Sequence, residues 1–163
     1  MIILGIDPGF ATIGYGVISV ERGRSSVVDY GTVKTPKELS FPERLLMIEK
    51  GITQLIEKFK PDQIAMEELF FNTNITTGIN VAHARGVILL TCAKHCDNLF
   101  EYTPLQIKQA LTGYGRADKQ QMMHMVKTLL RLDKIPRPDD AADALAVALC
   151  HGQTSRLGGL FRI

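Results

Sequence analysis

The sequence has few cysteines, no long apolar run and little net charge. Its three cysteines form no even disulfide framework, which fits a reducing compartment. No apolar run approaches the ~20 residues of a membrane span, and no basic region precedes the apolar start, so neither a membrane anchor nor a secretion signal is predicted. A net charge of +2 neither demands nor excludes a nucleic-acid partner, because a local basic groove matters more than the total. We therefore expect a cytoplasmic protein, and composition leaves its function open.

The chain also lacks internal repeats and low-complexity tracts. Its 163 residues are predicted to form one domain, residues 1–163, with a loose tail from about residue 152. Cys92, His95 and Cys96 lie at helical spacing, which raises the alternative of half a zinc site. Because the pair at 150–151 completes such a site poorly, buried structural thiols are the better interpretation.

A single carboxylate ends the first apolar segment. Residues 2–6 favour a strand buried on both faces, and the run stops at Asp7, before the turn residues Pro8 and Gly9. An ionised carboxylate at the end of a central strand is costly to bury without a counter-charge. Asp7 therefore either caps the turn by accepting backbone N–H groups or belongs to a metal or phosphate site, and this segment alone favours neither.

The order of predicted elements indicates an α/β fold with a five-stranded mixed sheet. Short connections join the first strand to two more at 13–20 and 26–33, which predicts an antiparallel meander. A capping box at Ser40 and Glu43 begins a helix with one apolar stripe, and Pro61 ends it. A parallel strand at 63–67 follows this crossover helix. The remaining predictions are a helix from about 76 to 96, a strand at 99–102, and helices at 103–113, 117–132 and 139–150.

A second acid repeats the pattern of Asp7. The strand at 63–67 runs from apolar residues into Glu67. If the two strands are adjacent and parallel, the two acids emerge side by side at the edge of the sheet where ligands bind.

The last helix adds two further acids. Asp140 and Asp143 are three residues apart and lie on one face near the helix start, where the helix dipole favours negative charge. Capping of the helix N-terminus is therefore a valid alternative role for these acids. Small apolar residues surround Asp143 in the sequence, however, and this favours a functional role for its carboxylate over simple solvation. Four converging carboxylates would repel one another unless cations lay between them, and an all-oxygen site suits Mg²⁺ or Mn²⁺. Two such ions about 3.5–4 Å apart can clamp a phosphodiester during an in-line displacement.

At these same positions the sequence resembles the RuvC family of bacterial Holliday-junction resolvases. The resemblance covers residues 2–151 in the family's order and spacing, so the motifs are jointly specific. They are residues 5–9 (GIDPG), 12–17 (TIGYGV), 65–70 (AMEELF), 84–86 (ARG) and 140–146 (DAADALA).

This resemblance implies an RNase H-like fold and a homodimer that makes paired, symmetric nicks in a four-way DNA junction during recombination and repair. It implies two Mg²⁺ ions per site, with Mn²⁺ as a substitute, and the RuvA–RuvB branch-migration complex as a partner. Asp7 would bridge the ions, and three further acids would complete the site, namely Glu67, Asp140 and Asp143. Asp139 and Asp140 can both face Asp143 at helical spacing, so either is a candidate third acid; the family motif favours Asp140, which would leave Asp139 as the helix N-cap.

Three further residues match positions that the family uses to contact DNA. Phe70 matches an aromatic that inserts at the junction centre, and Lys108 and Lys119 match basic positions near the scissile strand. From the residues alone, the core is the commoner place for an aromatic such as Phe70, and both lysines could be ordinary surface residues. A base stacked on Phe70 would contribute ~1–3 kcal/mol, and phosphate contacts from the lysines would make affinity depend on salt.

Two other functions remain alternatives. A nuclease of the same fold that acts on RNA or RNA–DNA hybrids would share the acids but need not share Phe70 or the dimer. An actin-like nucleotide-binding module would also carry an acidic turn after its first strand, but it needs two such domains, more than 163 residues supply. A non-catalytic DNA-binding scaffold would leave the repelling acids without a purpose.

Overall fold

The protein is built around a five-stranded mixed sheet. The structure, a computed structural model, describes residues 1–69, 75–154 and 160–163. The strands β1 (Ile2–Asp7), β2 (Thr12–Glu21) and β3 (Arg24–Lys34) form an antiparallel meander. The strands β4 (Gln63–Glu67) and β5 (Leu99–Tyr102) extend the sheet in parallel, giving the order β3-β2-β1-β4-β5. The predicted sheet, meander and parallel strands are confirmed.

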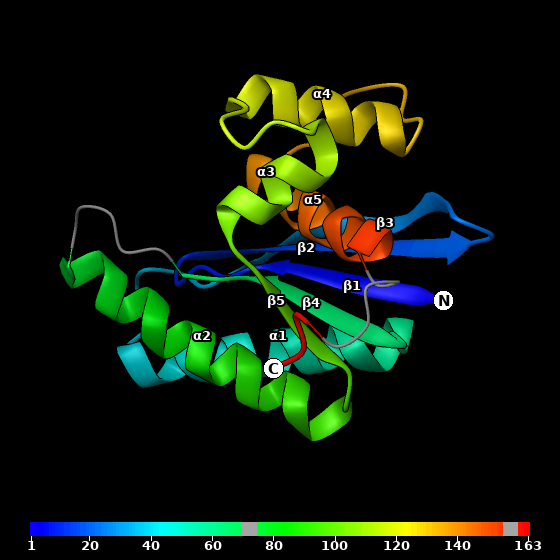
Figure 1. The fold of residues 1–163 in the computed structure, drawn as a ribbon. Helices are drawn as coiled ribbons and strands as arrows, with labels where there is room; N and C mark the ends of the chain where they lie inside the picture. The colour runs from blue at the N-terminus through cyan, green and yellow to red at the C-terminus, as the bar shows by residue number, and fades with distance from the viewer. Residues whose placement is uncertain (70–74, 155–159) are drawn as a thin grey trace.

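Helices cover both faces of this sheet (Figure 1). On one face lie α1 (Phe41–Phe59) and α2 (Ile75–His95), which contact each other. On the other, α5 (Asp139–Thr154) packs on β1 and β2, with α3 (Pro104–Thr112) and α4 (Lys119–Leu129) outside it. Each face has its own core, around Leu4 and Ile52 on the first and around Ile3 and Leu145 on the second. No helix in the described part of the chain is long and apolar enough to cross a membrane.

The predicted helix start at Ser40 is confirmed, because its N–H and hydroxyl both donate to the Glu43 carboxylate. The helix predicted at 117–132 is shorter at both ends. It begins after Asp118, whose carboxylate accepts from the Gln121 N–H at 2.8 Å, and it ends before Arg131, whose backbone is left-handed with φ 54°. Local capping therefore decides both ends.

The last helix is longer than predicted and ends at Thr154. The Thr154 hydroxyl lies 2.8 Å from the Cys150 carbonyl oxygen and 3.0 Å from the Tyr102 hydroxyl, so the final turn is held to β5. Residues 155–159 of the predicted loose tail lie outside the described residues. Beyond them, the Ile163 N–H donates to the Leu99 carbonyl at 3.0 Å, which pairs the chain end with β5.

Candidate active site

Asp7 and Glu67 lie side by side at the carboxyl ends of neighbouring parallel strands. Ile6 of β1 is paired with Met66 of β4, so the next residue of each strand is an acid. Burial and, after it, the charges of Glu67, Asp143 and Asp140 together raise the pKa of Asp7 to about 8, against the opposing charge of Lys119. Burial and, after it, the Asp143 charge together raise the pKa of Glu67 to about 7. The predicted pairing of these two acids is thus present, and both are held where the ionised form is disfavoured.

The start of α5 reaches the same place because it packs directly on strand backbone. A Cβ atom on Gly14 would lie 2.0 Å from the Asp140 carbonyl oxygen, and one on Gly5 would lie 2.2 Å from the Ala144 carbonyl oxygen. Gly14 is the β2 partner of Asp7. Only glycine permits this approach, and it places Asp140 one strand away from Asp7.

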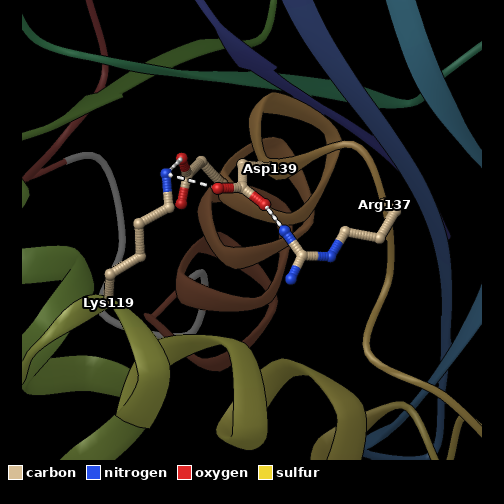
Figure 2. A network of polar contacts seen from close by, with 4 residues as sticks. Lys119, Arg137 and Asp139 are labelled. Carbon is tan, nitrogen blue, oxygen red and sulfur yellow. Dashed lines mark hydrogen bonds and ion pairs between the residues drawn. The ribbon is translucent and has the colours of Figure 1, made fainter.

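Asp143 lies one helical turn further along α5 and is bound by a lysine. Lys119 Nζ, at the start of α4, lies 3.4 Å from Asp143 Oδ2 and 3.3 Å from Asp139 Oδ2 (Figure 2). Burial raises the pKa of Asp143, the Lys119 charge and hydrogen bond lower it, and the net shift is upward. Lys119 therefore offsets part of the repulsion among the acids.

Asp139 is not the N-cap of α5, so that prediction is wrong. The Pro138 carbonyl accepts from the Ala141 and Ala142 N–H groups, which makes Asp139 the first helical residue. Its carboxylate lies between Lys119 and Arg137 and pairs with both (Figure 2). Burial raises the pKa of Asp139, but the hydrogen bonds and charges of the two cations outweigh burial, so its pKa is below the usual value.

Charge also distinguishes the two adjacent aspartates. Asp140 contributes to the raised pKa of Asp7, and Asp139 is not among the groups that shift it. Asp140 is therefore the one of the pair that acts on Asp7, whereas Asp139 is neutralised by Lys119 and Arg137.

Both predicted lysines lie beside the acids. A pocket of about 220 Å³ is lined by Glu67 and Asp143 together with Lys108 of α3 and Lys119 of α4. The Lys108 charge lowers the pKa of Glu67. The structure thus brings together all the predicted site residues except Phe70, which lies outside the described residues.

The acids do not form a closed coordination shell. Among residues 1–69, 75–154 and 160–163, no three acidic, histidine or cysteine side chains are close enough to hold a metal ion. The acidic end of the sheet, formed by Asp7, Glu67, Asp140 and Asp143, nevertheless offers only oxygen ligands. Oxygen ligands suit hard divalent cations. Burial first and neighbouring carboxylate charges second raise the pKa values of Asp7 and Glu67, and bound divalent cations would stabilise the ionised forms of both. On these grounds the residues fit a divalent metal site.

A buried polar network behind the acids was not predicted. The ring nitrogens of His151 lie 2.7 Å from the Tyr102 hydroxyl and 2.7 Å from the Gln63 side-chain oxygen. This network joins α5, β5 and β4; Glu67 is the last residue of β4, and its register partner on β5 is Tyr102. Burial lowers the pKa of His151 to about 4, so the ring is neutral at pH 7. The three residues are far apart in sequence, so no local spacing signals the network.

The sheet order and the buried acids at the carboxyl ends of its strands define an RNase H-like nuclease. The sequence model of the family described as crossover junction endodeoxyribonuclease RuvC matches residues 3–151. The chain belongs to this family.

Individual relatives agree with this assignment. Crossover junction endodeoxyribonuclease RuvC of Alkaliphilus oremlandii is 55% identical over 163 residues, which cover all of this chain and 99% of the relative. The Thermus thermophilus RuvC structure superposes with a TM-score of 0.91 at 34% identity and covers 100% of both chains. The structure of T. thermophilus RuvC in complex with Holliday junction substrate gives a TM-score of 0.93 at 34% identity, covering 100% of this chain and 99% of the other.

Proposed function

We propose that this protein resolves four-way DNA junctions by paired, symmetric hydrolysis of two phosphodiester bonds, in recombination and repair. One observation carries the proposal: β1, β4 and α5 bring Asp7, Glu67, Asp140 and Asp143 to one end of the sheet. Membership of the crossover junction endodeoxyribonuclease family supports the substrate class. A likeness to a RuvC bound to Holliday junction substrate, over the whole length of the chain, points the same way.

The acids, the lysines and the aromatic residue predicted for this site have separate proposed roles. Asp7, Glu67, Asp140 and Asp143 would hold two Mg²⁺ ions, with Mn²⁺ as a substitute. When bound, these ions supply an activated water and stabilise the leaving oxygen. Lys108 and Lys119 neutralise the approaching phosphates and so orient the scissile strand. Phe70, next to β4 in sequence, is proposed to stack on a base at the opened junction centre.

Paired cuts require two active sites, and the described part of the chain forms one cluster of acids at the end of its sheet. We assign the second site to another copy of the chain, bound through α2. One exposed stripe of this helix is small or apolar and recurs at helical spacing, with Ile79 51% and Leu90 58% exposed; its members are Ile79, Ala82, Gly86, Leu90 and Ala93. The exposed polar residues of the helix, His83, Lys94 and His95, lie outside this stripe. Gly86 in the stripe has open space where a Cβ would lie, so a second helix can approach closely. The RuvA–RuvB complex is the proposed supplier of junctions, and the reducing cytoplasm is the proposed location.

A cutting assay tests the proposal directly. A synthetic four-way junction, a linear duplex and an RNA–DNA hybrid are incubated with the protein, with and without Mg²⁺. We expect Mg²⁺-dependent, symmetric cuts in the junction and none in the duplex. Preferred cutting of the hybrid would support the RNA-directed alternative instead, and ATP binding without cutting would support the nucleotide-binding alternative.

A further inference from the structure

A second cavity lies at the end of the molecule opposite the acids. Its volume is about 1100 Å³, and the β2–β3 turn at 21–24, the end of α4 and the last turns of α5 line it. The first residue of β1 pairs with Ser19, close to this turn, whereas the last residue of β1 is Asp7. α5 likewise carries its acids at its start and contributes Leu149 and Gln153 to the cavity near its end. Figure 1 shows the β2–β3 hairpin on the side of the chain's N-terminus. A molecule bound in this groove would leave the acidic end free.

The groove is basic. Arg22, Arg24 and Arg131 are exposed and line it, against one acid, Glu21. In the described part of the chain, none of the three arginines forms an ion pair with an acidic side chain. Their charge is therefore available to an external ligand, and the arginine fork suits carboxylates.

Two of these arginines occupy backbone positions that suit them poorly. Arg22 has φ 47° in the hairpin turn, and Arg131 has φ 54° directly after α4. Glycine or asparagine adopts this left-handed conformation at lower cost, and glycine is the usual residue after a helix end. Arginine at both positions departs from this preference for glycine or asparagine, and no internal ion pair compensates for the cost. Such a departure is typical of a functional surface.

Part of the lining of the groove is apolar. Leu129 of α4 is partly buried and Leu149 of α5 is almost fully buried, and both line the cavity. The volume is at the upper end of what a small-molecule site needs and far exceeds a single phosphate. A leucine side chain cannot hydrogen-bond or pair with the phosphates of a DNA duplex, but it can pack against an apolar side chain.

We propose that this groove binds a segment of another protein in which acidic side chains flank an apolar one. The arginines pair with the carboxylates, and the apolar side chain lies against Leu129. This partner can bind while DNA occupies the opposite end, so the proposal does not depend on the substrate of the acidic end.

The experiment uses a fluorescein-labelled synthetic peptide, Asp-Asp-Glu-Leu-Phe-Asp-Glu-Asp, titrated with the full-length protein and followed by fluorescence anisotropy. We expect saturable binding that weakens with salt. The double variant Arg22→Asn and Arg131→Asn should bind at least about tenfold more weakly. Asparagine tolerates the left-handed backbone, so we expect the variant to retain the wild-type thermal midpoint and junction cutting. The control removes two exposed lysines elsewhere, Lys37→Asn with Lys94→Asn, and should bind as the wild type does.

Several results would overturn the proposal. These are no binding of the peptide at millimolar protein, equal weakening by the control pair, or unchanged affinity when serine replaces both apolar residues of the peptide. A larger loss of junction binding in the arginine variant than in the lysine variant would also overturn it, because the groove would then be a DNA surface.

Discussion

Asp7 is the residue whose surroundings most disfavour its ionised form. It is largely buried, next to one acid and near two others, and its pKa is raised to about 8. The unfolded chain binds its proton with a pKa of 3.8, so between these values the folded state holds more protons than the unfolded state. The stability that the neutral form of Asp7 contributes is fully present below pH 3.8, and it is lost as the pH rises through about 8.

We therefore predict that Asp7→Asn stabilises the metal-free protein at alkaline pH. Between pH 6.5 and 8.5 the wild type should lose about 2 kcal/mol from this group, and the variant should lose less. His151, with a pKa of about 4 when folded and 6.5 when unfolded, destabilises the fold only at lower pH. Glu67, with a pKa of about 7 when folded, also loses stability in this window, but it does so in both proteins, so the difference between their pH curves reports Asp7. Urea unfolding at several pH values measures this. Parallel pH curves for both proteins would contradict the assigned pKa, and Mg²⁺ should stabilise the wild type more than the variant.

The same substitution separates catalysis from binding. Asp7→Asn should reduce junction cutting by roughly three orders of magnitude or more, because it removes a metal ligand. Junction binding should persist, since one negative charge fewer faces the phosphates. Gel-shift and cutting assays on one preparation measure both quantities. If binding falls together with cutting, Asp7 serves the fold.

Lys119 has a role that is also measurable at the residue scale. Lys119→Gln removes the cation beside Asp143, so the pKa of Asp143 should rise and cutting should fall more at pH 6 than at pH 8.5. As a phosphate contact, Lys119 should also contribute to salt dependence, and its loss should reduce the log–log slope of junction binding by about one. Lys127→Gln, elsewhere on α4, is the control. A uniform loss at both pH values with an unchanged slope would show that Lys119 only supports the structure.

At the scale of elements, the position of α5 depends on glycine in the strands beneath it. Gly14→Ala would bring a Cβ to 2.0 Å from the Asp140 carbonyl oxygen, so α5 must shift. We expect a loss of about 3 kcal/mol in unfolding free energy or more. We also expect at least about 100-fold slower cutting, since a shift of ~1 Å misplaces the acids. Ser19→Ala on the same strand is the control and should change stability by less than about 0.5 kcal/mol. Normal cutting by Gly14→Ala would mean that the start of α5 does not position the site.

The elements that could be predicted from sequence are those whose signals are local. The capping box at Ser40 and the strand at 63–67 depend on residues a few positions apart, and both are confirmed. Asp7 and Glu67 could be paired because the crossover rule makes their strands parallel. The ends of α4 were misplaced because apolar periodicity continues past the Asp118 cap and past the left-handed Arg131.

The parts of the site that could not be predicted depend on docking between distant segments. The Lys119 contacts with Asp139 and Asp143 join α4 to α5 across 20 or more residues. Asp139 was wrongly assigned as the N-cap because Pro138, which lacks a capping side chain, takes that position. No spacing rule signals the contact of Gly14 with Asp140, which exists only once α5 lies on the sheet. Phe70 stays a prediction.

At the scale of the whole molecule, the exposed face of α2 is the surface proposed to bind a second copy. Ile79, Gly86 and Leu90 lie along it, on the far side of the helix from the buried Ile88. Both sites of a symmetric junction can be cut in one binding event only if two acidic ends are joined. The oligomeric state should therefore decide the product: paired cuts from a dimer and single nicks from a monomer.

Leu90→Asp tests this coupling, because a buried charge in the contact should weaken self-association by about 100-fold or more. Light scattering after size exclusion should then find a monomer. A cruciform plasmid should give nicked circles in place of the linear product of paired cuts. Leu46→Asp is the matched control, since Leu46 is 68% exposed on α1, and it should remain dimeric and yield linear product. If Leu46→Asp breaks the dimer and Leu90→Asp does not, the contact lies on α1. If Leu90→Asp is monomeric yet still linearises the plasmid, paired cutting does not require two joined chains.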